Sequence, residues 1–141
     1  LRLSRGLGDV YKRQIEEMIK RCVKGNIQFD FTPHLSPMFR GILSTIYVEL
    51  NKTSSASKIL NTLKKYYKKA NFIKILNKDK LISTNDVINT NNCNISAVCK
   101  SKNKNKIIIL SAIDNLIKGG AGQAIQNMNL KFNFPKDAGF K

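Results

Sequence analysis

The segment that decides the fold is residues 91–113, NNCNISAVCKSKNKNKIIILSAI, in which a polar stretch separates two apolar ones. Asn91–Lys100 and Lys106–Ile113 are predicted to be the strands of a hairpin, with Ser101–Asn105 as the polar connection between them. The second strand is a continuous apolar run, which is typical of a strand covered on both faces. We therefore expect Lys106–Ile113 to be a central strand.

Three further strands are predicted on the N-terminal side of this hairpin. Ile42–Leu50 and Phe72–Leu76 are rich in β-branched and aromatic residues, which favour strands. Ile27, Phe29 and Phe31 alternate with polar residues, a pattern that indicates a half-buried strand. Between this pattern and Ile42 lie two prolines, which exclude regular structure there.

Two helices are predicted in the same half of the chain. Thr53–Ser55 can cap a helix that runs to about Ala70, and its expected apolar stripe is Ile59, Leu63, Tyr66 and Ala70. Ile15, Met18, Ile19 and Cys22 follow helical spacing and indicate the end of an earlier helix, which Gly25-Asn26 terminates.

The C-terminal part is predicted to form a glycine-rich turn and a last helix. Asp114-Asn115 ends the apolar strand, and Gly119-Gly120-Ala121-Gly122 leads into a helix with Ala121, Ala124, Ile125 and Met128 on one face. Small residues let a backbone or a ligand approach closely, and the start of a helix can face an anion. The element order is then α-β-β-α-β-β-β-α, which favours an α+β domain with a mostly antiparallel sheet and flanking helices.

Composition narrows the class of protein. The 141 residues suffice for one domain, and no apolar run approaches the ~18 residues of a membrane span. The formal charge of +16 comes from 25 Lys and Arg against 9 Asp and Glu, but the lysines are dispersed, so we expect no nucleic-acid partner and no membrane partner. Three cysteines without a disulfide framework indicate a reduced, cytoplasmic setting.

Residues 1–14, LRLSRGLGDVYKRQ, are expected to be foreign to the domain. They lack the periodicity of a helix or strand, and Asp9–Gln14 resembles the translation of a transposase mosaic end used in sequencing libraries. Such segments are excluded from fold reasoning. The domain is therefore expected to begin at Ile15.

The residues taken alone indicate no catalytic centre and no metal site. His34 is the one histidine and lies on a proline-containing loop, and although loops carry function, a lone histidine is more often a hydrogen-bonding structural residue. Cys22, Cys93 and Cys99 form no C-x-x-C motif. The glycine-rich stretch matches neither G-x-G-x-x-G nor a P-loop, so close packing and ligand contact both stay open for it.

Three segments are similar to those of one enzyme family. Phe31–Leu43, FTPHLSPMFRGIL, resembles the F-T-P-H-L-x-P-M-x-R-G-I-L run of N-acetyl-γ-glutamyl-phosphate reductases. Asp86–Ile95 resembles the family's D-V-x-G-S-N-x-C-D-I segment, with Asn89 in place of Gly. Asp114–Asn129 resembles its D-N-L-x-K-G-A-A-G-Q-A-x-Q-N-M-N segment, with Gly120 in place of Ala. Because Asn tolerates positive φ, we expect the turn at Asn89 to persist.

This resemblance implies an architecture. It implies a domain like the C-terminal domain of glyceraldehyde-3-phosphate dehydrogenase, followed by a helix that returns to a Rossmann domain encoded by earlier sequence. Residues 15–113 are then part of the catalytic and dimerisation domain. Residues 114–141 are a helix and tail that contact the nucleotide-binding domain. The whole enzyme is expected to be a homo-oligomer.

The resemblance also implies an activity in arginine biosynthesis. These enzymes reduce an acyl phosphate, a small molecule, to N-acetylglutamate semialdehyde with NADP as the cofactor, through a cysteine nucleophile and a histidine acid–base partner. Both catalytic residues belong to sequence before Ile15, so we assign no catalytic residue to this chain and expect it to be inactive alone.

Two sets of site residues follow from the family motifs. His34 and Arg40 are expected on the substrate side, since Arg suits phosphate. The residues expected to bind the cofactor are Asn115, Lys118, Gly119, Gly122, Gln123 and Gln126.

Two alternatives stay open. Aspartate-semialdehyde dehydrogenases share the D-N-L-x-x-G-A-A type segment, but they place a histidine where this chain has Ile42. A stand-alone basic binding or scaffold module is a rival of another class, and strong salt-dependent binding to DNA or RNA would support it.

Overall fold

The computed structural model describes residues 3–22, 30–52, 54–77, 80–98 and 105–140. The chain forms two compact units, residues 1–37 and residues 38–141. The described residues of the first unit contain one helix, α1 (Leu3–Cys22). The second contains the sheet and two helices that follow in the chain, α2 and α3, together with a short 3₁₀ helix, η1 (Thr84–Asp86), and a π-helical turn, η2 (Ile117–Ala121).

The helix α1 is longer than predicted. The expected helix end at Cys22 is present, but the helix begins at Leu3 and continues across the Gln14–Ile15 junction, where a segment without regular structure was expected. Of the predicted strand at Ile27–Phe31, residues 27–29 and the Gly25-Asn26 stop lie outside the described residues. Phe31 itself is exposed and lies in no strand.

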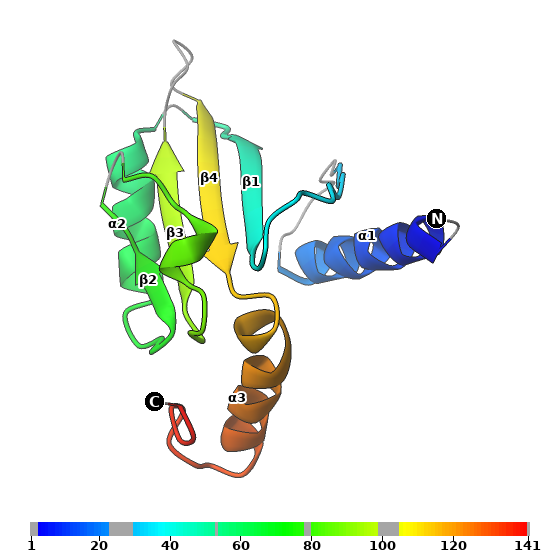
Figure 1. The fold of residues 1–141 in the computed structure, drawn as a ribbon. Helices are drawn as coiled ribbons and strands as arrows, with labels where there is room; N and C mark the ends of the chain where they lie inside the picture. Colours follow the sequence, from blue (N-terminus) through cyan, green and yellow to red (C-terminus); the bar gives the residue numbers. More distant parts are fainter. Residues whose placement is uncertain (1–2, 23–29, 53, 78–79, 99–104, 141) are drawn as a thin grey trace. The chain divides into compact units, whose positions relative to one another are not determined.

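A four-stranded sheet forms the body of the second unit (Figure 1). Its strands are β1 (Ile42–Glu49), β2 (Ile73–Ile75), β3 (Cys93–Val98) and β4 (Lys106–Ile113), in the spatial order β1-β4-β3-β2. The predicted hairpin is confirmed, because β3 and β4 pair antiparallel, and β4 is central as expected. The short strand β2 pairs parallel with β3, so the sheet is mixed but mostly antiparallel. The α+β prediction is confirmed.

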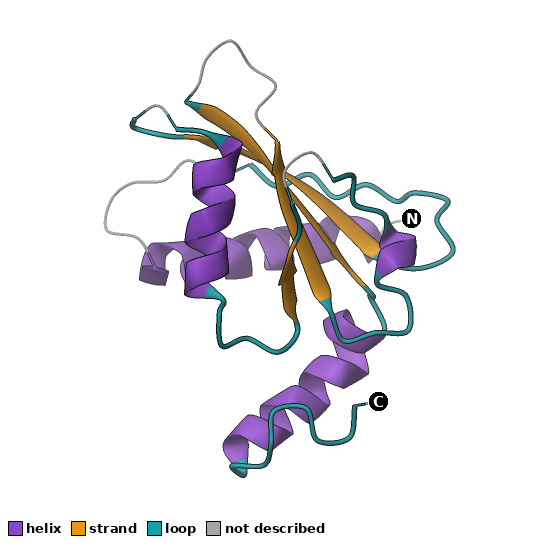
Figure 2. Cartoon of the chain, turned by 90° about the vertical axis from the view of Figure 1, so that its left-hand side faces the viewer, coloured by secondary structure: helices purple, strands orange, loops and turns teal. Residues whose placement is uncertain are grey.

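The helix α2 (Ala56–Tyr66) covers one face of this sheet (Figure 2). Ser55 caps it as predicted, with its side chain accepting a hydrogen bond from the backbone N–H of Lys58. The buried cluster consists of Ala56 and Leu60 from the helix and Ala97 and Ile107 from the sheet. The predicted stripe was partly wrong: Tyr66 is 80% exposed, and the helix ends there instead of at Ala70 because the backbone enters a turn.

The helix α3 (Gly122–Lys131) lies beyond the end of the sheet and not on its face (Figures 1 and 2). Its predicted apolar face is partly exposed, with Ile125 at 36% and Met128 at 47%. The helix buries Gly122 and the polar Asn129, and the side-chain Nδ2 of Asn129 donates to the backbone carbonyl of Ala138 over 2.8 Å. The tail therefore folds back along the helix, and Phe140 reaches the ring of Phe72.

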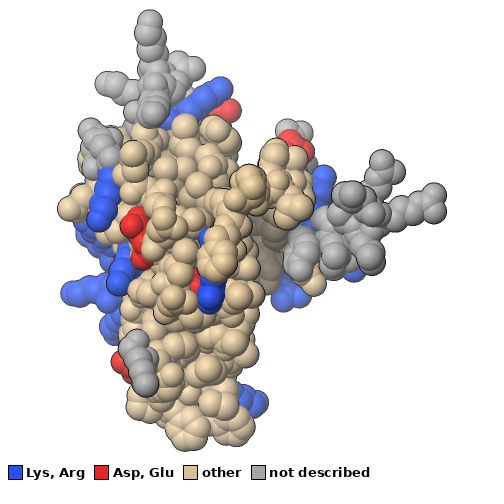
Figure 3. All heavy atoms as spheres, in the orientation of Figure 1, with Lys and Arg blue, Asp and Glu red and all other residues tan. Residues whose placement is uncertain are grey.

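Lysine side chains gather along the margin where α2 lies (left in Figure 3). The exposed lysines of this region are Lys58, Lys64, Lys65, Lys68 and Lys69. The dispersed basic surface predicted from the sequence is thus denser over α2 than elsewhere on the visible face. In the part of the chain that the structure describes, no helix is long and apolar enough to cross a membrane.

Candidate functional site

The end of β4 and the turn that follows it form the best-organised polar region of the described chain. Asp114 closes the strand, and its Oδ1 accepts hydrogen bonds from the backbone N–H groups of Leu116 (2.8 Å) and Ile117 (2.9 Å). Such bonds from an Asp to the backbone two and three residues later are typical of turns. The backbone carbonyl of Asp114 also accepts from the N–H of Gly119. One aspartate therefore shapes the start of the glycine-rich turn.

The second carboxylate oxygen of Asp114 binds two other segments. Oδ2 lies 2.9 Å from Nε of Arg40, which precedes β1, and 2.8 Å from the backbone N of Asn89. The Asp114 side chain is fully buried, whereas the Arg40 side chain keeps 20% of its surface exposed. Burial raises the pKa of Asp114, but the backbone N–H groups of Ile117, Asn89 and Leu116 and the Arg40 side chain outweigh it and lower that pKa to about 2. Asp114 is therefore a buried anion at neutral pH.

The turn at Asn89 has the geometry that was predicted for it. Asn89 has a φ of 60°, in the left-handed region that Asn tolerates better than most residues. This conformation directs its backbone N–H to Asp114. The substitution of Asn for the Gly of the family motif therefore leaves the turn intact.

Asn115 adds a second link between the end of β4 and the start of β1. Its Oδ1 accepts a hydrogen bond from the backbone N of Gly41 over 2.8 Å. Gly41 has a φ of +108°, and a Cβ there would lie 2.7 Å from Cβ of Thr84, so this position requires glycine. Asp114 and Asn115 thus hold Arg40 and Gly41, which follow one another in the chain and lie 74 residues before them.

Lys118 and Gln126 meet across the turn. Nζ of Lys118 donates to Oε1 of Gln126 over 2.8 Å, and Nδ2 of Asn91 donates to the same oxygen over 3.2 Å. Nζ of Lys118 also lies 5.6 Å from the centroid of the Phe72 ring. Burial lowers the pKa of Lys118, and a Cys93 thiolate would oppose that shift in part. The lysine is therefore a half-buried cation held by an amide and a ring.

The glycines of the turn differ in the space around them. At Gly122, which is buried, a Cβ would lie 2.5 Å from Oδ1 of Asn91 and 2.7 Å from Cγ2 of Ile117. At Gly119 the nearest atoms would lie 3.6 Å away, which is ordinary contact. Close packing explains Gly122, whereas the surroundings of Gly119 leave it able to approach another group.

The structure brings most of the predicted cofactor residues together. Asn115, Lys118, Gly119, Gly122 and Gln126 all lie on the turn or on the first turns of α3. Gln123 lies in the first turn of α3 as well, but its side-chain Nε2 donates along the helix to Oδ1 of Asn127.

The two residues predicted on the substrate side lie in different compact units. Arg40 joins the predicted cofactor group through Asp114. His34 belongs to the first compact unit, where its Nδ1 lies 3.1 Å from the carbonyl oxygen of Thr32.

Two residues of this region were not predicted as site residues. Asp114 was expected only to end a strand, although an acidic residue directly after a buried strand and before Asn-Leu is a recognisable turn pattern. Asn91 is 5% exposed, and its role depends on a contact with a residue 35 positions later, which no local pattern reveals.

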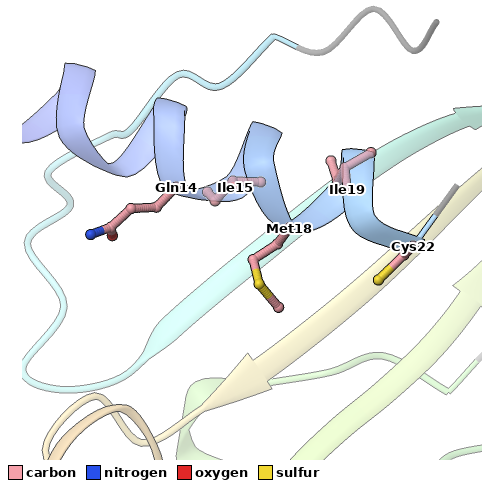
Figure 4. Close-up of a pocket in the computed structure, with 5 residues that line it drawn as sticks. All are labelled: Gln14, Ile15, Met18, Ile19 and Cys22. Atoms are coloured by element: carbon pink, nitrogen blue, oxygen red, sulfur yellow. The ribbon is translucent and has the colours of Figure 1, made fainter.

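Other surfaces of the described chain offer less chemistry. A hollow on α1 is lined by Gln14, Ile15, Met18, Ile19 and Cys22, all from one helix (Figure 4). These residues include no charged side chain and no histidine. Among the described residues, no cluster of three or more His, Cys, Asp or Glu side chains could hold a metal ion.

Comparison with known protein families shows to which family this chain belongs. Residues 11–115 match the family model described as "Semialdehyde dehydrogenase, dimerisation domain". The chain belongs to this family. The match ends at Asn115, the residue that links the turn to Gly41. It begins four residues before the predicted domain start at Ile15, and whether residues 1–14 are foreign stays a prediction.

Proteins similar to this chain include N-acetyl-γ-glutamyl-phosphate reductases. The one from Halothermothrix orenii is 47% identical over 130 residues, which cover 91% of this chain and 37% of that protein. The one from Geobacter metallireducens is 40% identical over 138 residues, covering 96% of this chain and 40% of that protein. The predicted resemblance is confirmed. The chain spans about two fifths of the length of these relatives.

A solved structure supports the fold. Aspartate semialdehyde dehydrogenase II from Vibrio cholerae, crystallised in complex with ASA, matches with a TM-score of 0.55 and 19% identity. The match covers 69% of this chain and 28% of that one. At this identity the likeness establishes a common fold and no more.

Proposed function

We propose that this chain is the C-terminal part of an N-acetyl-γ-glutamyl-phosphate reductase, an enzyme that reduces an acyl phosphate to N-acetylglutamate semialdehyde with NADPH in arginine biosynthesis. The observation that carries the proposal is the 47% identity to such a reductase over 91% of the chain. The proposal includes a cytoplasmic setting, in agreement with the free thiols of Cys22 and Cys93.

In the proposed enzyme this chain supplies binding groups and not the reacting ones. None of its cysteines matches the position of the family's nucleophile. His34 belongs to a different motif from the family's catalytic histidine. The proposal therefore assigns no catalytic residue to this chain and expects no turnover from the chain alone. A homo-oligomer of the whole enzyme is part of the proposal, because the matching family model is a dimerisation domain.

The residues of the turn fit a nicotinamide dinucleotide. Oδ1 of Asn115 and Oε1 of Gln126 accept hydrogen bonds within the protein, while their amide N–H groups bond to no described residue. These donors suit the carboxamide of a nicotinamide ring, and Lys118 is a cation that suits a phosphate. The partly exposed Ile125 and Met128 offer apolar contact area. The cofactor supplies the hydride when it is bound.

The residues proposed to hold the cofactor are Asn115, Lys118, Gly119, Gly122, Gln123 and Gln126. Gln123 depends on a rotation of its side chain away from Asn127, because its Nε2 donates there. On the substrate side, Arg40 is the stronger candidate. Its Nε faces Asp114, and its guanidinium is only partly buried, so the remaining N–H groups can address a phosphate or carboxylate. His34 is kept as a second substrate-side candidate.

The experiment that tests this function is an assay of the full-length protein. The coding sequence is extended upstream at the native locus, and the purified product is assayed for phosphate-dependent reduction of NADP⁺ by N-acetylglutamate semialdehyde. We expect turnover with this substrate and little with aspartate semialdehyde. Preferential turnover of aspartate semialdehyde would favour the alternative dehydrogenase. Absence of both activities in a folded full-length protein would refute the proposal.

A further inference from the structure

Asp114 is the point at which three separate segments of the second unit meet. Arg40 lies before β1, Asn89 lies in the turn before β3, and Leu116 and Ile117 begin the turn that leads to α3. Each of them makes its contact to the same fully buried carboxylate. Three backbone N–H groups donate to its two oxygens, and Nε of Arg40 lies 2.9 Å from Oδ2, so each of the three segments supplies a group to this carboxylate.

The two oxygens of Asp114 divide these contacts between two sides of the proposed site. Oδ1 accepts from Leu116 and Ile117 and so fixes the direction of the turn that carries Lys118 and Gly119. Oδ2 faces Arg40 and accepts from Asn89. Nε of Arg40 is held while the terminal nitrogens of its guanidinium bond to no described residue.

From this division we propose that Asp114 is a positioning residue that orients Arg40 for the acyl phosphate and the Lys118–Gly122 turn for the cofactor, through separate carboxylate oxygens. The inference rests on the proposed function, because the roles of Arg40 and of the turn come from it. Asp114 itself touches neither substrate nor cofactor. Asn115 supports the same arrangement, since its contact with Gly41 holds the residue next to Arg40.

The test uses the full-length enzyme and the variant Asp114→Asn. An Asn has only one acceptor oxygen, and its NH₂ group would face the donors that the other carboxylate oxygen accepts from. The variant therefore loses the negative charge and the contacts of either Oδ1 or Oδ2. We expect the KM for the acyl phosphate to rise about tenfold and the KM for NADPH to rise several-fold. A purely structural defect would reduce the amount of active enzyme and so lower the apparent kcat with both KM values unchanged.

Asp86→Asn is the matched control. Asp86 is an exposed residue of η1 that accepts a hydrogen bond from the backbone N of Ser83 over 3.1 Å, and the side-chain oxygen of an Asn can still accept this bond, so the same substitution there changes only the charge of a local cap. We expect both KM values of this variant to equal those of the wild type. If Asp114→Asn gives the kinetics of Asp86→Asn, the positioning proposal is wrong while the proposed function stands. An inactive wild type would overturn both.

Arg40→Lys keeps the proposal testable if Asp114→Asn does not fold. This variant keeps a cation beside Asp114 and leaves the three backbone donors in place. It removes the guanidinium, whose Nε faces Asp114 and whose terminal nitrogens would bind the phosphate. We expect a rise of about tenfold in the KM for the acyl phosphate and an unchanged KM for NADPH. Unchanged KM values for both substrates would overturn the role of Asp114 toward Arg40.

Discussion

The two neighbouring strands β4 and β1 are alike in length and apolar content, yet only β4 has fully buried residues. They pair over eight residues, from Ile42 opposite Ile113 to Glu49 opposite Lys106. In β4, Ile107 is 1% exposed and Ala112 is fully buried, whereas in β1 Ile46 is 45% exposed and Tyr47 is 78% exposed. Similar sequence patterns therefore have very different surroundings in the same sheet.

The difference lies in what each strand has as neighbours. β4 has a strand on either side, its Ile107 belongs to the buried cluster under α2, and its Ile109 packs against that cluster. β1 is an edge strand, and α2 contacts mainly β3 and β2. A long apolar edge is a ready surface for pairing or packing with another chain or segment. The sequence of β1 is thus suited to a partner, which agrees with its place in a dimerisation-domain family.

The largest expected effect is a difference in stability between two matched substitutions, one in each strand. Ile107→Ala in β4 is expected to lower the free energy of unfolding by about 2–5 kcal/mol, because it leaves a cavity in the buried cluster. Ile46→Ala, the same substitution on the same face of β1, is expected to cost less than about 1 kcal/mol. Urea denaturation of both variants measures the contrast. Equal losses would show that β1 is as well packed as β4.

A second prediction contrasts the acidic residues at the ends of the two strands. The pKa of Asp114 is lowered from 3.8 to about 2, so its contribution is complete above pH 3.8 and is lost as the pH falls toward 2. This loss is about 2 kcal/mol. In an acid-denaturation series, Asp114→Asn should be less stable than the wild type at neutral pH and should lose less on acidification. Glu49→Gln at the exposed end of β1 should lose stability with falling pH as the wild type does. If Asp114→Asn loses as much stability on acidification as Glu49→Gln, Asp114 is not the buried anion that this account describes.

A smaller effect is expected at the turn that donates to Asp114. Asn89→Ala should destabilise the protein by about 1 kcal/mol, because Ala tolerates a φ of 60° less well than Asn does. Asn89→Gly should be neutral or stabilising, since Gly adopts this φ freely. Thermal unfolding of both variants distinguishes them. If Ala and Gly have the same effect, the backbone conformation at residue 89 does not limit stability.

The smallest effect on stability is expected at the exposed face of β1. Tyr47→Thr should change the free energy of unfolding by less than about 0.5 kcal/mol, because the side chain packs little within the described chain. The same change should weaken self-association of the full-length protein in sedimentation velocity if β1 contacts a second copy. Lys65→Gln on α2 is a control for a surface substitution away from this strand. Equal association of all three proteins would remove β1 from the interface.

Patterns local in sequence predicted most of the fold. The hairpin, the central place of Lys106–Ile113 and the Ser55 cap follow from the residues of those segments themselves, whereas the turn at Asn89 was expected from the family motif. The stripe of α2 was partly wrong, because which side of a helix is buried depends on where the sheet lies. The parallel pairing of β2 depends on a strand about twenty residues later, and nothing in its three residues indicates the direction.

The candidate site was predicted in its residues but not in its organisation. The family motifs gave Asn115, Lys118 and Gln126, and the structure brings Lys118 and Gln126 into contact. Asp114 was missed because its four donors come from three segments, which only the fold brings together. Long-range polar contacts of this kind have no sequence period.

The most direct test of the central claim is to sequence the native locus across the junction between Gln14 and Ile15 and to follow the reading frame upstream. The account predicts that the frame continues through a histidine motif, a nucleophilic cysteine and a Gly-rich strand–helix turn, as in the reductases that this chain resembles. A start codon close to Ile15, with no such sequence before it, would contradict the claim and leave a stand-alone domain whose binding partners would then be the question.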